Sequence, residues 1–337
     1  MGKIVGVDIG ESSVKLVYFS GKTLKKAITA DLPDDMVAGG RILSKDAMAD
    51  FLRETAKSSG IPLCGAAIAL PSGEVLSREL TMPAMTEQQL RYNLPYEFHD
   101  FLDEEKSKYF FDYSVRAIHK DEEGFPREMD IYACAMRKQD VEDYRAMFRR
   151  AGFKLKVLTP VECAYANLVG PYLCRIGNEQ QDCCVINLGH SMTQMYMFRG
   201  PFTTGQREID LGLSELDRLI AEHCAVDIHV AREYKKDNFG GVLDSDYARE
   251  FYSRLAVEIM KAVNFYHYNN RERELQALFL CGGGSVIAPL RQAIADMTKL
   301  RIHPAEELLA DDLRTENAWR YLRAIGGVSE EIKGGLA

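Results

Sequence analysis

The sequence lacks an apolar run long enough to cross a membrane. No stretch approaches the roughly 18 consecutive apolar residues that a spanning helix needs. The apolar run in the opening MGKIVGVDIG is short and is interrupted by Asp8, which is unlike a secretory signal peptide. Gly2 also lacks the downstream serine or threonine of a myristoylation signal. These absences predict a cytoplasmic protein.

The sequence also lacks a surplus of basic residues and any paired cysteine motif. It has 42 lysines and arginines against 50 aspartates and glutamates, a net charge of −8. This balance provides no basic footprint for nucleic acid or for an acidic membrane surface. The eight cysteines include no CxxC pair, and most lie in apolar segments. We therefore expect buried, reduced thiols instead of a disulfide framework or a zinc site.

One hairpin pattern occurs twice in the chain. The segment 4–21, IVGVDIGESSVKLVYFSG, predicts an apolar strand, a tight polar turn and a returning strand. The segment 183–200, CCVINLGHSMTQMYMFRG, repeats that pattern without a gap, so that Gly10 aligns with Gly189 and Ser12 with Ser191. The repeat favours two duplicated domains, although two unrelated hairpins would be the simpler alternative.

The residues in these turns suit a phosphate ligand. Glycine lets backbone N–H groups approach an anion closely, and the serine hydroxyls can donate further hydrogen bonds. Asp8 could hold a hydrated Mg²⁺ ion, which prefers one or two carboxylates and retained water molecules. Two such turns facing each other would enclose a polyphosphate.

Length and pattern divide the chain into two lobes and an insertion. At 337 residues the chain exceeds one typical domain of about 150 residues. We expect an α/β protein in which residues 1–73 and 158–182 form the first lobe and residues 183–337 the second. Residues 74–157 read as an inserted β-α-β-β-α-β subdomain of the split-βαβ type. Within the second lobe, residues 213–277 are mainly helical, and an apolar helix near 317–328 could return to the first lobe.

A glycine cluster follows the last long apolar strand. Gly282, Gly283 and Gly284 come directly after the strand ending at Cys281 and before a predicted helix. A strand, a glycine turn and a helix N-terminus together suit contact with a nucleotide, although a mobile turn would have the same composition. The sequence contains neither the GxxxxGK[ST] phosphate loop nor the GxGxxG dinucleotide motif.

These motifs together resemble the superfamily of actin-like, sugar-kinase and heat-shock-chaperone ATPases. The resemblance rests on VDIGESSVK, LTPVECAYANL, INLGHSMT and LCGGGSV, and it covers nearly the whole chain. An insertion entered by MPAMTEQQLRYNLPYEF is similar to that of the division protein FtsA, and more similar to that of the PilM family of type IV pilus assembly proteins. The tail EEIKGGLA lacks the apolar face of FtsA's membrane-binding helix.

The resemblance implies ATP or ADP with Mg²⁺ as the ligand. It places the nucleotide-binding residues on three segments and on one helix: Asp8, Gly10, Ser12, Ser13 and Lys15; Gly189, Ser191 and Thr193; Gly282, Gly283 and Gly284; and Lys235. Asp8 would hold the metal through water, and Lys15 would reach the β-phosphate. The alternative for Lys15 is a solvent-facing residue of a strand.

Three positions depart from the superfamily pattern. Asn187 stands where relatives have an aspartate, Thr159 where they have a glutamate before Pro160, and Arg232 where a glutamate contacts ribose. Glu162 and Glu233 lie close enough in sequence to compensate after a local shift. General-base catalysis contributes about 10²–10⁴-fold to a rate, so we expect slow or absent hydrolysis and assign no catalytic residue. The nucleotide would be structural, or the degenerate site has lost it.

Membership of the PilM family would imply a scaffold recruited to the inner face of the cell membrane. Such a scaffold captures the N-terminal cytoplasmic peptide of a PilN-like membrane protein and links it to other platform and motor proteins of the pilus machine. The peptide would lie between the first lobe and the inserted subdomain, where Leu90, Leu94 and Phe98 are candidate contacts, although core packing is the preferred interpretation of each. Contact with the membrane would be indirect, and a homo-oligomeric ring is compatible with this role. An active ATPase or kinase of the same fold, or an FtsA-like division protein, are the alternatives.

Overall fold

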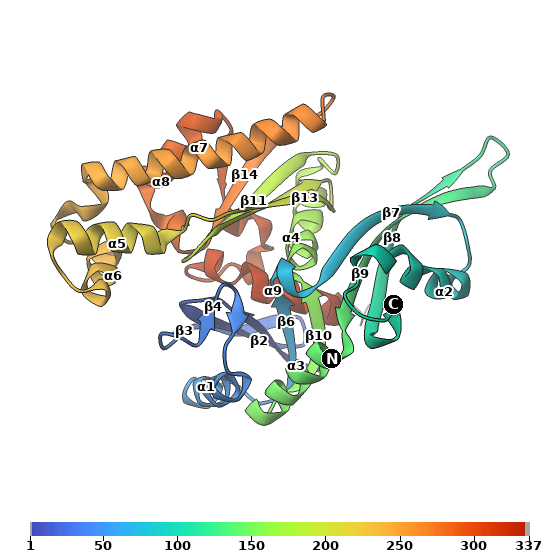
Figure 1. Ribbon diagram of the computed structural model, residues 1–337, viewed down its shortest axis with the longest axis horizontal. Helices are drawn as coiled ribbons and strands as arrows, with labels where there is room; N and C mark the ends of the chain where they lie inside the picture. The colour runs from blue at the N-terminus through green and yellow to red at the C-terminus, as the bar shows by residue number, and fades with distance from the viewer. Residues whose placement is uncertain (1, 334–337) are drawn as a thin grey trace.

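The computed structural model describes residues 2–333 and contains two lobes with a smaller subdomain beside them (Figure 1). Each lobe is built on a five-stranded sheet, in the orders β10-β6-β1-β2-β3 and β13-β12-β11-β14-β15. In both lobes the first strand pairs antiparallel with the second and parallel with the fourth. The two sheets therefore share one topology around the repeated hairpin, as the sequence repeat predicted.

The helices and strands divide between the two lobes and the subdomain. The first lobe contains β1 (Lys3–Ile9), β2 (Ser13–Ser20), β3 (Thr23–Asp31), β4 (Val37–Ala38), β5 (Arg41–Ile42), α1 (Lys45–Ser58), β6 (Gly65–Leu70), α3 (Lys138–Ala151), β10 (Lys154–Pro160) and α4 (Val161–Ile176). The subdomain contains β7 (Leu76–Pro83), α2 (Glu87–Glu97), β8 (Tyr109–Lys120) and β9 (Pro126–Arg137). The second lobe contains β11 (Asp182–Leu188), β12 (Thr193–Arg199), β13 (Phe202–Ile209), α5 (Leu213–Cys224), α6 (Ile228–Asp237), α7 (Asp246–Asn269), β14 (Leu275–Cys281), α8 (Ala288–Thr298) and β15 (Arg301–Pro304), and the described chain ends with α9 (Leu322–Lys333).

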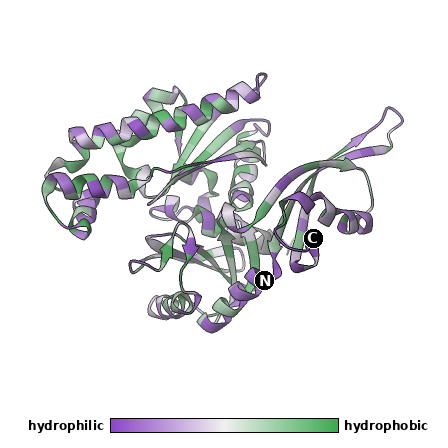
Figure 2. Ribbon diagram, viewed as in Figure 1, coloured by the Kyte–Doolittle hydropathy of each residue, from purple (hydrophilic) through white to green (hydrophobic). Residues whose placement is uncertain are grey.

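Local sequence signals explain where several of these elements begin and end. The side chain of Ser44 accepts a hydrogen bond from the N–H of Ala47 and caps α1. Thr86 and Gln89 form the predicted capping box at the start of α2. Gly152 ends α3 with a left-handed conformation, φ 92°, which favours glycine. Figure 2 shows hydrophobic residues concentrated in the central strands of both sheets, whereas the outer helices alternate between hydrophobic and hydrophilic residues.

The inserted subdomain is smaller than the sequence pattern predicted. Its sheet has three strands in the order β7-β9-β8, with α2 packed on it. The expected final strand, β10, instead pairs parallel with β6 in the first-lobe sheet. Helix α3 packs on α1 and shares the first-lobe core through Tyr144 and Phe148. The split-βαβ arrangement over 74–157 was therefore wrong, because the parallel β6–β10 pairing bridges a long sequence separation that local periodicity does not reveal.

Helices α4 and α9 lie between the two sheets and share one hydrophobic cluster with both of them. Two glycines allow α9 to approach the first lobe closely. A methyl group on Gly6 of β1 would collide with the carbonyl oxygen of Ala324, and one on Gly326 would collide with the backbone of Ala164 in α4. The terminal helix is therefore held in a fixed position against β1 and α4. No helix within residues 2–333 is long and apolar enough to cross a membrane.

This close packing makes Gly326 sensitive to added volume. We expect Gly326→Ala to lower the free energy of unfolding by about 1–3 kcal/mol, because the methyl group has no space beside Ala164. Gly73→Ala is the matched control, since a methyl group there meets no atom within 4 Å, and its effect should stay within about 0.5 kcal/mol. Urea unfolding of the two variants measures both values. Equal stability of the two variants would contradict the packing described for α9.

Candidate functional site

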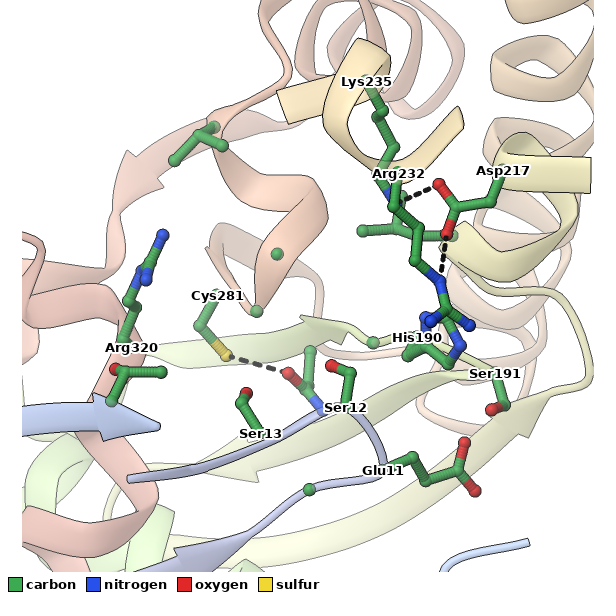
Figure 3. A pocket seen from close by; sticks show the side chains of 18 of the residues that line it. Glu11, Ser12, Ser13, His190, Ser191, Asp217, Arg232, Lys235, Cys281 and Arg320 are labelled. Atoms are coloured by element: carbon green, nitrogen blue, oxygen red, sulfur yellow. Dashed lines mark hydrogen bonds and ion pairs between the residues drawn. The ribbon is translucent and has the colours of Figure 1, made fainter. Parts of the chain in front are cut away.

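A cleft of about 1410 Å³ lies between the two lobes. The β1–β2 turn forms one wall, and the β11–β12 turn, α5 and α6 form the opposite wall. Figure 3 shows Ser12 and Ser13 on the first turn facing the side of the cleft that carries His190 and Ser191. The described chain therefore brings the two halves of the sequence repeat to one cavity.

The two turns have the same backbone geometry. The N–H of Gly10 donates to the carbonyl of Ser13 at 3.0 Å, and the N–H of Gly189 donates to the carbonyl of Met192 at 3.1 Å. A methyl group on Gly189 would lie 2.7 Å from the Met192 oxygen, so the second turn requires glycine for close approach. These glycine turns leave hydroxyl and backbone groups directed at the space between the lobes.

Asp8, at the end of β1, is the ionic centre of the first-lobe wall. It is buried, and its Oδ1 lies 3.3 Å from Nε of Arg323 on α9. Its Oδ2 lies 3.9 Å from Nζ of Lys15 on β2. Oδ1 of Asp8 and Nε of Arg323 have no hydrogen-bond partner among the described residues. The contact is thus an ion pair whose polar atoms keep unused hydrogen-bonding capacity.

Burial and neighbouring charges shift the protonation of these groups. Burial lowers the pKa of Lys15 below its ordinary value, and Arg323 and Arg320 lower it further, whereas Asp8 opposes the shift. Burial also disfavours the charge on Arg323, but the attraction of Asp8 outweighs it and raises the pKa of the guanidinium. Arg323 therefore stays charged, and Lys15 is a desolvated ammonium facing the cleft.

The opposite wall carries a second buried carboxylate. Asp217 of α5 is 1% exposed, with its Oδ1 2.6 Å from Nζ of Lys235 and its Oδ2 3.9 Å from Nε of Arg232, both on α6 (Figure 3). Arg232 also donates to Asp34 of the first lobe at 3.1 Å, and this hydrogen bond lowers the pKa of Asp34. His190 lines the cleft nearby, and burial lowers the pKa of its imidazole, which is neutral at neutral pH. One ion-paired cluster thus braces α5 and α6 and reaches the other lobe.

The glycine cluster after β14 closes the third side of the cleft. Gly282 has φ 80° and lies so close to Asn187 and Leu188 that no side chain fits there. Gly283 begins a short 3₁₀ turn, Gly283–Val286, and contributes to the lining. Gly284 lies behind the cleft wall, where it packs against Leu188.

The structure brings most of the predicted binding residues together. Those lining the cleft are Asp8, Gly10, Ser12, Ser13, Lys15, Gly189, Ser191, Lys235, Gly282 and Gly283. Thr193 lies outside this lining, since its buried hydroxyl donates to the carbonyl of Leu211 at 2.9 Å. Thr193 and Gly284 therefore support the walls of the cleft instead of facing its interior.

Asn187, at one departing position, and Glu162, near another, have other partners. The amide of Asn187 donates to Gln194 at 3.4 Å, and its oxygen lies 4.0 Å from the Cys281 sulfur. Glu162 is buried away from the cleft lining and accepts hydrogen bonds from Ser77 at 2.8 Å and Tyr132 at 2.7 Å. Glu162 consequently ties α4 to the inserted subdomain and does not replace the missing carboxylate.

Several residues of the cleft were not identified from the sequence, namely Arg320, Arg323, Asp217 and His190. The contact of Arg232 with Asp34 of the first lobe was also not identified. Arg320 ends a short 3₁₀ turn just before the apolar terminal helix, and Arg323 lies in the first turn of that helix; the spacing of these two arginines was the available signal. The partners of Asp217 lie on the next helix, so a helical acid at that position carries little information alone.

The chemistry of the walls suits an anionic ligand with several phosphate groups. Lys15, Arg320 and Arg323 line one side of the cleft, and Arg232 and Lys235 line the other. Charged donors of this kind form strong hydrogen bonds with phosphate oxygens, particularly through arginine. The unpartnered Nε of Arg323 and the two glycine turns are consistent with such a ligand. Among residues 2–333, no group of three or more His, Cys, Asp or Glu side chains could hold a metal ion.

A comparison with protein families places the chain. The family model described as type IV pilus assembly protein PilM matches residues 6–317. The chain belongs to the PilM family. This match covers the inserted subdomain and most of both lobes, ends before Arg320, Arg323 and α9, and confirms the resemblance found in the motifs of the sequence.

Solved structures with the same fold agree with the family. The chain is similar to a chain of the PilM–PilN type IV pilus biogenesis complex, with 20% identity, 98% of each chain covered and a TM-score of 0.80. It is also similar to the ethanolamine utilization protein EutJ from Carboxydothermus hydrogenoformans, with 15% identity, 97% and 90% covered and a TM-score of 0.62. ADP-bound MreB5 of Spiroplasma citri gives 13% identity, 100% and 98% covered and a TM-score of 0.55. The predicted actin-like fold is confirmed.

The lowered pKa of Lys15 leads to a test of its role. The folded state disfavours the charged ammonium, so this charge opposes folding at neutral pH, and stability should rise between the lowered pKa and the ordinary value. We therefore expect Lys15→Met to raise the Tm of the ligand-free protein at pH 7 and to abolish the stabilisation produced by added ATP. Thermal unfolding with and without ATP measures both effects.

The control for this test is Lys25→Met, because Lys25 is an exposed lysine on the neighbouring strand β3. It should leave both the Tm and the ATP response unchanged. A Lys15→Met protein with a lower Tm and an intact ATP response would show that Lys15 serves only as a counter-charge for Asp8.

Proposed function

We propose that the protein is a nucleotide-binding scaffold of the type IV pilus assembly platform. In this role it binds the N-terminal cytoplasmic peptide of a PilN-like membrane protein. The observation that carries the proposal is the family match over residues 6–317, together with the similarity over 98% of the chain to the PilM–PilN complex. Recruitment to the inner face of the membrane would follow from this partner, as would its links to other platform and motor proteins.

The inserted subdomain offers a site for an extended peptide. Its three-stranded sheet has β7 and β8 as edges, and an edge strand has free backbone donors and acceptors that can pair with another chain. β7 begins at the junction with the first lobe and carries Leu76, which is 38% exposed. The earlier candidates Leu90, Leu94 and Phe98 are at most 2% exposed and form the subdomain core, so they are not surface contacts.

The same subdomain is connected to the nucleotide lobes at two points. Ser77 of β7 and Tyr132 of β9 donate to Glu162, next to the cleft-facing helices. Arg116 of β8 pairs with Glu79 at 2.8 Å and donates to the carbonyl of Thr203 in the second lobe at 3.0 Å. These contacts support a scaffold in which a peptide-binding surface and a nucleotide cleft adjust together.

Nucleotide binding without rapid hydrolysis fits the cleft best. Its glycine turns and the lysine and arginine side chains on both walls suit ATP or ADP, and the ADP-bound MreB5 structure has the same fold. Asn187 is neutral and cannot accept a proton as a general base, and Glu162 is engaged elsewhere. Losing a general base removes about 10²–10⁴-fold from a rate. We expect the bound nucleotide to stabilise the fold of the scaffold without being rapidly hydrolysed.

Peptide binding is tested with a labelled N-terminal cytoplasmic peptide of a PilN-like protein. Fluorescence anisotropy should show saturable binding to the native protein, and a scrambled peptide of the same composition should not bind. Absence of binding at high micromolar protein would contradict the proposal.

The position of the peptide is tested with two exposed apolar residues. We expect Leu76→Asp, at the junction with the first lobe, to weaken binding by about tenfold or more, as central apolar contacts of interfaces do. Phe125→Asp is the matched control, because Phe125 is 62% exposed in the distant β8–β9 turn. A loss of binding with Phe125→Asp alone would move the peptide to the hairpin.

A further inference from the structure

Arg323 occupies a position at which it interferes with a metal ion. Its side chain is only 13% exposed, and its Nε lies 3.3 Å from the carboxylate of Asp8. The resemblance to actin-like ATPases predicted that this same carboxylate would hold Mg²⁺ through water. A cation bound at that carboxylate would share it with a charged guanidinium, and the two positive charges would repel each other.

The position of Arg323 is set by helix packing and not by a flexible loop. Ala324, the next residue, places its carbonyl oxygen against Gly6 of β1, two residues before Asp8. Gly326 contacts the backbone of Ala164 in α4. Because α9 is fixed on both sides, the Arg323 backbone cannot withdraw from Asp8 without separating the helix from the first lobe.

Three positive side chains gather around the Asp8 carboxylate. Lys15, Arg320 and Arg323 face the carboxylates of Asp8 and Asp31 along this wall of the cleft. Nε of Arg323 has no hydrogen-bond partner within the described residues. Buried charges require partners, and a phosphate oxygen is a suitable partner for a guanidinium.

Two side chains at or near the positions of the missing carboxylates are committed to other contacts. The Asn187 amide is held by Gln194 and lies beside Cys281, and the Glu162 carboxylate is bound by Ser77 and Tyr132. Mg²⁺ usually needs one or two carboxylates with retained water molecules in addition to the phosphate oxygens. Asp8, the carboxylate predicted to hold the metal, is already paired with Arg323 and Lys15, so this position does not fit Mg²⁺, whereas its two cations fit phosphate groups.

We propose that this cleft binds a nucleoside di- or triphosphate as the metal-free anion. Arg323, held beside Asp8, supplies the positive charge that Mg²⁺ supplies in related ATPases. The inference rests on the nucleotide binding proposed above and specifies the form of the ligand. In this proposal Asp8 does not hold a metal ion. It holds Arg323 in position and stabilises the positive charge of the guanidinium.

The test is isothermal titration of the native protein with ATP in excess EDTA and in excess MgCl₂. We expect the Kd in EDTA to be equal to or lower than that in MgCl₂, because the free anion carries more negative charge. A Kd in EDTA more than about threefold higher would overturn the inference while leaving nucleotide binding intact. No heat of binding in either buffer would instead contradict the nucleotide part of the proposed function.

Two variants connect this result to the arginine. Arg323→Gln should weaken ATP binding in EDTA by about tenfold or more, and MgCl₂ should restore part of the affinity. Arg149→Gln, on the exposed face of α3, should bind as the native protein does. Unchanged binding by Arg323→Gln in EDTA would overturn the role of Arg323. If Arg323→Gln does not fold, the double variant Asp8→Asn/Arg323→Gln, which removes both members of the buried pair, takes its place with the same expected loss.

Discussion

The ion pair between Asp8 and Arg323 is the interaction on which the rest of the cleft depends. It joins the end of β1, at the centre of the first-lobe sheet, to the last helix of the described chain. Removing one member of a buried pair leaves an uncompensated charge, which typically costs about 3–5 kcal/mol. The same carboxylate also holds a second positive charge at the cleft, because Lys15 on β2 faces its other oxygen. Asp8, Arg323 and Lys15 thus connect the packing of α9 to the nucleotide recognition proposed for the cleft.

Close backbone packing makes this arrangement possible. Small residues let α9 lie directly on β1 and α4, and the duplicated hairpins bring a second glycine turn opposite the first. Glu162 in α4 then connects the wall of the lobes to the inserted subdomain through Ser77 and Tyr132. Helix α4 therefore offers a route from the cleft, which Tyr165 lines, to the subdomain proposed to bind the peptide. In a PilM-family scaffold such a route would let nucleotide occupancy influence partner binding without turnover.

The sequence predicted those parts of the molecule that local patterns or repetition encode. The repeated hairpin fixed the duplicated lobes, and the capping box at Thr86 located α2 correctly. Strand β15 was not predicted because its four residues are too few to form a pattern. The pairing of β10 with β6 was not predicted, because the two strands are far apart in the sequence. Arg323 was missed for the same reason, since only the three-dimensional packing of α9 brings it beside Asp8. Composition and periodicity record no such contact.

The chemical identity of the nucleotide that the protein retains tests the central claim most directly. The native protein is incubated with ATP for several hours, separated from free nucleotide, denatured and analysed by anion-exchange chromatography. The account predicts that unhydrolysed ATP is recovered in an amount close to one molecule per chain. Recovery of ADP with equivalent phosphate release would show that the cleft is a working ATPase and would contradict the assignment of the cleft as a structural nucleotide site.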